Sequence, residues 1–136
     1  MEQRWSQPFH WGLLMAFDAT EPFEPPHLSR DEAVQASDTS MSVPVLHAQD
    51  IETPPGIGPD EPLPHAEVQV TVHVGGSALE HPEFEAKLYC PSGRLQVGDA
   101  EASRIIEVPP GVLRVQVNRR PQQFAEEVVL HVASEG

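Results

Sequence analysis

The second half of the chain alternates apolar and polar residues with the period of a β-strand. Residues 67–74 read Glu-Val-Gln-Val-Thr-Val-His-Val, which places four valines on one face and polar side chains on the other. This alternation is typical of an antiparallel strand that is buried on one face only. Similar stretches follow at 84–90, 95–97, 105–108, 113–117 and 128–132. Five or six short strands within residues 67–136 predict an all-β sandwich or barrel.

Turn signals separate these strands. Gly75-Gly76-Ser77 interrupts the first alternating run, and Pro91-Ser92-Gly93 follows the second. Pro109-Pro110-Gly111 is a strong turn signal, because proline presets φ at one corner and glycine tolerates positive φ at the next. We therefore expect consecutive strands joined by tight connections in this half of the chain.

The N-terminal half has fewer regular elements. Phe9–Phe17 and Met41–His47 are interpreted as strands, and Pro44 favours an edge position for the second. Ser29 and Glu32 have the spacing of a capping box, which predicts a short helix through Ala36. Residues 49–64 contain five prolines and two glycines, so we expect a long loop there. The prediction is a single domain over residues 1–136, an antiparallel β-sandwich of about seven or eight short strands with one short helix.

Charge narrows the range of partners. The chain has 21 acidic and 8 basic residues, a formal net charge of −13. Nucleic acid and anionic membrane surfaces both attract clustered Lys and Arg, so neither is an expected partner. Residues 1–66 hold 11 acidic and 2 basic side chains, so the acidity is concentrated in the loop-rich half. A basic protein is the partner that this charge permits.

Targeting, metal and catalytic signals are weak. The apolar run Trp11–Phe17 is too short for a membrane span and a poor signal peptide, and we expect a cytoplasmic protein. The single cysteine, Cys90, falls in the apolar row of its strand and is expected to be a buried thiol. Seven histidines lack the spacing of known metal motifs, and no nucleophile motif occurs. We therefore expect no metal, no cofactor and no enzymatic activity.

The acidic side chains of the predicted loops have two interpretations. They keep the loops solvated, or they form a recognition surface for a basic partner, stiffened by the neighbouring prolines. An outward tyrosine on the predicted strand 84–90 is the best exposed aromatic anchor. The candidate partner-binding residues are Asp31, Glu32, Asp50, Glu52, Asp60, Glu61 and Tyr89.

The order of these elements resembles a known bacterial family. The chain has Phe17-Asp18 at a strand end, an acidic loop, a capped segment with Ala33 and Ala36, and Ser40-x-Ser42-Val43-x-Val45. Later comes Ile106-Glu107-Val108-Pro109-Pro110-Gly111-x-Leu113-Arg114-Val115. This pattern resembles the competence-protein J-type nuclease inhibitors and related immunity-like β-sandwich proteins. The resemblance implies an acidic, cytoplasmic protein without cofactor or catalytic residues.

Two function classes remain from the sequence. The first is an inhibitor or immunity-type module that neutralises a basic bacterial enzyme such as a nuclease or toxin. The second is a sandwich domain that binds a small ligand or carbohydrate in a concave site with exposed aromatics. The aromatic content of 6% favours the first class.

Overall fold

The described residues form an all-β structure. The computed structural model describes residues 1–9, 12–20, 34–46, 67–99, 102–121 and 125–135, and these contain ten strands and no helix. The strands are β1 (Glu2–Gln7), β2 (Leu13–Asp18), β3 (Gln35–Ala36), β4 (Ser40–Pro44), β5 (Val68–Val74), β6 (Phe84–Cys90), β7 (Arg94–Gly98), β8 (Ser103–Glu107), β9 (Gly111–Arg120) and β10 (Glu127–Ser134). Every strand expected in the second half of the chain is confirmed.

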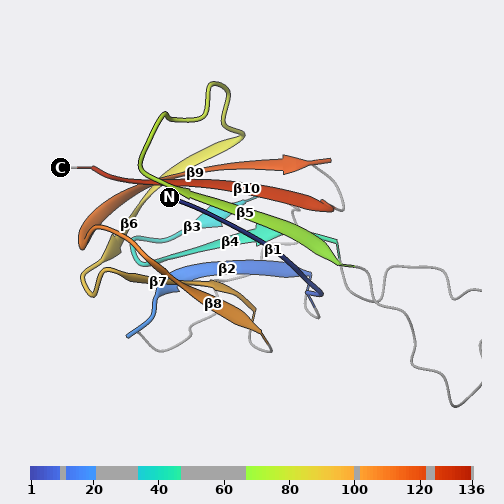
Figure 1. Ribbon diagram of the computed structural model, residues 1–136, viewed down its shortest axis with the longest axis horizontal. Coiled ribbons are helices and arrows are strands. Elements are labelled where there is room, and N and C mark those ends of the chain that lie inside the picture. Colours follow the sequence, from blue (N-terminus) through green and yellow to red (C-terminus); the bar gives the residue numbers. More distant parts are fainter. Residues whose placement is uncertain (10–11, 21–33, 47–66, 100–101, 122–124, 136) are drawn as a thin grey trace, which may run out of the picture.

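The strands form two five-stranded sheets that face each other (Figure 1). The first sheet has the order β1-β5-β10-β9-β6, and the second has the order β3-β4-β2-β7-β8. Side chains from the inner faces of both sheets share one apolar core. Its fully buried members include valines from β5 and β9, as the alternating pattern predicted: Val68, Val70, Val72, Val115 and Val117. The expectation of a two-sheet, all-β fold is confirmed.

One pair of neighbours departs from the antiparallel prediction. β10 runs parallel to β5, with Val128 opposite Val70 and Leu130 opposite Val72. Parallel neighbours require a long crossover connection, and here strands β6 to β9 lie between the two in sequence. The alternation of apolar and polar residues along a strand shows which face is buried, but it does not show whether the neighbouring strand is parallel or antiparallel. The sequence pattern therefore could not predict the parallel pairing of β5 and β10.

The N-terminal region forms two strands where one was expected over Phe9–Phe17. β2 occupies only its second part, and Gly12, at φ 68°, donates its N–H to the Phe9 carbonyl at 3.2 Å in a turn. β1 was missed because Trp5 is its only large apolar residue. Its other inward side chain, Gln7, is buried and accepts from Trp5 Nε1 at 2.8 Å while donating to the Ala102 carbonyl at 2.9 Å.

The end of the predicted helix over 29–36 is a strand. Gln35 and Ala36 form β3, opposite Ser42 and Met41 of β4. The Ser37 side chain accepts from the Ser40 N–H at 3.2 Å, so local hydrogen bonds close a hairpin there. Residues 29–33 and the predicted loop 49–64 lie outside the described residues. None of the described segments forms a helix long and apolar enough to cross a membrane.

Candidate functional site

Tyr89 is the one candidate contact residue that the structure describes. Its side chain is 50% exposed on β6, as predicted. The six predicted acidic contacts lie in segments 21–33 and 47–66, outside the described residues: Asp31, Glu32, Asp50, Glu52, Asp60 and Glu61.

The residues that flank segment 47–66 lie at one end of the sandwich, and Tyr89 lies at the other end. Leu46, which precedes the segment, donates its N–H to the Ala125 carbonyl at 2.9 Å, next to the start of β10. β5 follows segment 47–66 and begins at the same end of the sandwich as β10. β6 runs in the opposite direction to β9 and has Tyr89 near its last residue, at the other end of the sandwich (Figure 1). Tyr89 lies opposite Val112 at the start of the ten-residue β9. We call this second end the Tyr89 end.

Most of the net charge lies outside the described strands. Segments 21–33 and 47–66 together contain eight acidic residues and one basic residue. The described residues contain twelve acidic and seven basic ones, a net charge of −5 that is spread over a much larger number of residues. The density of negative charge is therefore higher in these two segments than in the sandwich.

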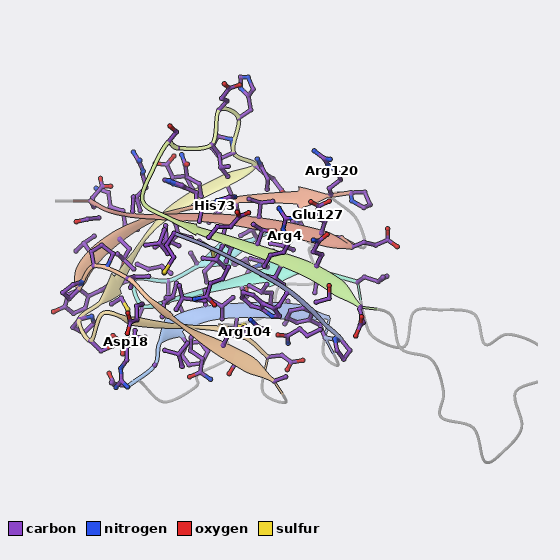
Figure 2. All side chains as sticks on the ribbon, in the orientation of Figure 1. Arg4, Asp18, His73, Arg104, Arg120 and Glu127 are labelled. Atoms are coloured by element: carbon purple, nitrogen blue, oxygen red, sulfur yellow. The ribbon has the colours of Figure 1, made fainter. Side chains whose placement is uncertain are left out.

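A buried carboxylate at the Tyr89 end holds two connections together. Asp18, at the end of β2, has no exposed surface. Its Oδ1 accepts from the Thr20 N–H at 2.7 Å and from the Ser92 hydroxyl at 3.0 Å, and its Oδ2 accepts from the Ser92 N–H at 3.0 Å. The Thr20 hydroxyl donates as well. Figure 2 shows Asp18 at this end of the second sheet.

The hydrogen bonds decide the ionisation of this carboxyl. Burial by itself would raise the pKa of Asp18, but the four donors from Thr20 and Ser92 lower that pKa well below its ordinary value of 3.8. Asp18 is therefore a carboxylate at neutral pH. Through its two hydrogen bonds with Ser92, it joins β2 to the turn between β6 and β7.

Cys90 lies beside this carboxylate and is an inert thiol. It is completely buried, as the sequence predicted. Burial, the neighbouring Asp18 charge and a hydrogen bond with Asp18 together raise the pKa of Cys90 to about 11. A nucleophilic cysteine needs a lowered pKa and access to solvent, and Cys90 has neither.

The opposite end of the sandwich contains a buried ion pair. Arg119 Nε donates to both Glu83 carboxylate oxygens at 3.0 and 3.1 Å, and its Nη2 also contacts this carboxylate. Arg119 Nη1 donates to the Pro44 carbonyl at 3.2 Å, so the arginine links β9 to β4 of the second sheet. The side chains of Arg119 and Glu83 are 5% and 17% exposed. These contacts give the pair a structural role.

The outer face of the first sheet has a row of polar side chains across all five strands. In register from β1 to β6 they are Glu2, His73, His131, Gln116 and Glu85. An open pocket of about 300 Å³ beside β1 and β5 is lined by the first three of them, by Met1 and Leu79, and by residues 74–77. His131 is buried, with Nε2 2.9 Å from the Gly75 carbonyl oxygen. Among the described residues, no group of three metal-binding side chains comes together.

Comparison with solved structures gives two matches of the whole fold. The first is the crystal structure of ComJ, inhibitor of the DNA degrading activity of NucA, from Bacillus subtilis. It covers 98% of both chains at 11% identity, with a TM-score of 0.58. The second is described as crocagin biosynthetic gene J, with 13% identity over 99% of this chain and 96% of the other, and a TM-score of 0.51.

No family model and no curated protein matches this sequence. At such low identity the two structural matches show a shared fold and no more. That fold agrees with the family resemblance expected from the Val-Pro-Pro-Gly turn and its flanking strands.

Proposed function

We propose that this chain is a non-catalytic, protein-binding inhibitor that neutralises a basic bacterial enzyme, with a nuclease as the first candidate and a toxin domain as the second. The observation that carries the proposal is the likeness of its fold to ComJ over nearly the full length of both chains. ComJ inhibits a DNA-degrading protein. An inhibitor of this kind needs only a complementary surface, with neither catalytic group nor cofactor.

The charge of the chain supports this target class. An enzyme that cleaves DNA presents basic side chains to the phosphate backbone. Segments 21–33 and 47–66, with eight acidic residues and one basic residue, offer the opposite charge. Asp31, Glu32, Asp50, Glu52, Asp60 and Glu61 are the carboxylates that we propose to face the basic surface.

The chemistry of the sandwich also supports a binding role. Asp18 and Cys90, two groups that an enzyme could use, are buried, and their hydrogen bonds and shifted pKa values make one a structural carboxylate and the other an inert thiol. Arg119 and Glu83 are engaged with each other. We therefore propose that the binding chemistry comes from the acidic segments and not from these buried groups of the sandwich.

The test begins with capture of the target. The chain is immobilised, extract from its own cell is passed over it, and any basic protein retained is assayed for DNA cleavage with and without added chain. We expect stoichiometric inhibition of a nuclease. Recovery of small ligands or carbohydrates alone would instead favour the ligand-binding alternative.

Association kinetics with the captured enzyme then test the charge mechanism. The association rate should fall steeply as salt shortens the Debye length from about 30 Å at 0.01 M to about 8 Å at 0.15 M. Asp60→Asn with Glu61→Gln should slow association by less than about tenfold and leave dissociation nearly unchanged. Glu80→Gln with Glu107→Gln removes the same charge from the sandwich and serves as the control. Equal effects of the two double variants would contradict the assignment of the contact surface.

A further inference from the structure

The Tyr89 end presents an exposed apolar pair next to two cations. Tyr89 of β6 and Val112 of β9 lie opposite each other and are 50% and 44% exposed. Lys87 is two residues before Tyr89 on β6, and Arg114 is two residues after Val112 on β9; the two lie opposite each other. Because side chains two positions apart on a strand point to the same face, all four are on one face of the sheet. We call these four side chains the Tyr89 patch. The two charged members of the patch are basic, whereas the net charge of the chain is negative.

The two cations of the patch differ in their partners. Lys87 Nζ lies 3.3 Å from the Glu135 carboxylate, in an exposed ion pair. Within the described part of the chain, no carboxylate lies within ion-pairing distance of the Arg114 guanidinium, and its buried Nε has no hydrogen-bond partner. Arg114 is half-buried, so holding it in place for a ligand costs less side-chain entropy than for a fully exposed arginine.

We propose that the Tyr89 patch is a second interaction surface, and that it binds a protein segment presenting a carboxylate next to an apolar side chain. The carboxylate pairs with Arg114, whose planar guanidinium suits two-point binding. The apolar side chain packs on Tyr89 and Val112. Tyrosine and arginine are both enriched among the residues that contribute most of the binding energy in protein interfaces.

The backbone around Tyr89 is already fixed for this role. The Tyr89 N–H donates to the Asp38 carbonyl at 2.7 Å, which ties β6 to the turn between β3 and β4. Three residues further on, Ser92 is held by the buried Asp18. A patch fixed on both sides loses little conformational entropy on binding.

The charge of the whole chain favours a protein segment over nucleic acid. Lys87, Arg114 and an exposed tyrosine also suit a stacked base with its phosphate. A nucleic acid would have to approach a chain of net charge −13, which opposes the counterion release that drives such binding. Binding of nucleic acid is therefore an outcome that would overturn the proposal.

The test uses a displayed library of random linear peptides, selected on the immobilised chain. We expect the selected peptides to be enriched in Asp or Glu next to Leu, Ile, Phe or Trp. Arg114→Gln should weaken the binding of these peptides by about tenfold or more. Tyr89→Ala should weaken it to a similar extent. Both positions are on the sheet surface, and matching melting curves would confirm that the variants fold.

Arg120→Gln is the matched control. Arg120 lies on the same strand and the same face as Arg114 but at the opposite end of β9 (Figure 2), and its replacement should change peptide affinity by less than about twofold. The proposal is wrong if no peptide is enriched, if the selected peptides lack acidic residues, or if they bind Arg114→Gln as well as the wild type. It is also wrong if short single-stranded oligodeoxynucleotides bind more tightly than the peptides. The target enzyme is not present in this peptide-binding experiment, so its outcome does not depend on whether the proposed inhibitory function is correct.

Discussion

Replacement of Asp18 by asparagine is the sharpest test of the structural account. The substitution keeps the shape of the side chain but removes its charge and turns one acceptor oxygen into an NH₂ donor. Four donors from Thr20 and Ser92 point at the two oxygens of Asp18, so the new NH₂ must face at least one of them. The variant therefore loses a hydrogen bond and gains a donor-to-donor contact in a site without exposed surface.

The size of the effect follows from the number and kind of the lost interactions. A hydrogen bond to a charged group contributes about 1.5–3 kcal/mol, and a buried donor without an acceptor costs a comparable amount. Relaxation of the Ser92 turn offsets part of this cost, so we expect Asp18→Asn to lower the free energy of unfolding by about 2–4 kcal/mol at pH 7. For a chain of this size the melting temperature should fall by roughly 10 °C.

The effect also has a defined dependence on pH. The pKa of Asp18 is lowered on folding, so its contribution to stability is complete above the unfolded pKa, near 4, and is lost as pH falls towards the folded value. Between these two values the wild type should lose stability by up to about 1.4 kcal/mol per pH unit from this group. Asp18→Asn has no such group, so the difference between the two proteins should be constant above about pH 5 and shrink below about pH 4.

Urea unfolding of both proteins between pH 3 and pH 8 measures this difference directly. Asp38→Asn, at an exposed acid in the turn between β3 and β4, is the control and should change stability by less than about 0.5 kcal/mol. A stability gap between wild type and Asp18→Asn that stayed constant down to pH 3 would refute the assignment of a lowered pKa. Equal stability of the two proteins at pH 7 would refute the buried hydrogen-bond network itself.

Three other variants or probes test the remaining contacts. Leu130→Ala, in the fully buried core, should cost about 2–5 kcal/mol in urea unfolding, and a loss below 1 kcal/mol would contradict the shared core. Arg119→Met should cost about 3–5 kcal/mol because it leaves Glu83 without its cation, and adding Glu83→Gln should recover part of the loss; no recovery would argue against the ion pair. Cys90 should react with a thiol reagent at pH 8 only on unfolding, and rapid labelling of the native protein would contradict its burial and raised pKa.

The strands of the second half could be predicted because their core is built from alternating valines. Val68, Val70 and Val72 of β5 all face the core, so period and face were both evident in the sequence. β1 was missed because its burial depends on Trp5 and on an internally hydrogen-bonded Gln7. β3 was missed because the capping-box spacing of Ser29 and Glu32 outweighed a two-residue strand that exists only through its pairing with β4.

The burial of polar side chains could not be predicted from the sequence pattern. Gln116 is on the polar face of β9, yet it is only 5% exposed. It accepts from the Leu79 N–H at 2.9 Å and donates to Glu85 at 3.1 Å, so the connection after β5 covers it. Asp18 had a local signal, since Asp and Thr two residues apart favour an Asx-type turn, but its contact with Ser92 joins positions 74 residues apart.

At the Tyr89 end, the hydrogen bonds of Asp18 that stabilise the fold lie next to the patch that we propose to bind a protein segment. The Asp18 network fixes the turn that follows β6, and two members of the Tyr89 patch, Lys87 and Tyr89, lie near the end of that strand. If the patch binds as proposed, weakening this network should loosen the patch and raise the entropy cost of binding without removing any contact.

Asp18→Asn, measured well below its melting temperature, should therefore weaken the binding of the selected peptides by about twofold to tenfold, mainly through faster dissociation. Leu130→Ala is an equally destabilising change in the core on β10, and it should leave peptide affinity unchanged. A loss of affinity in both variants would mean that global stability, and not the Asp18 network, sets the binding.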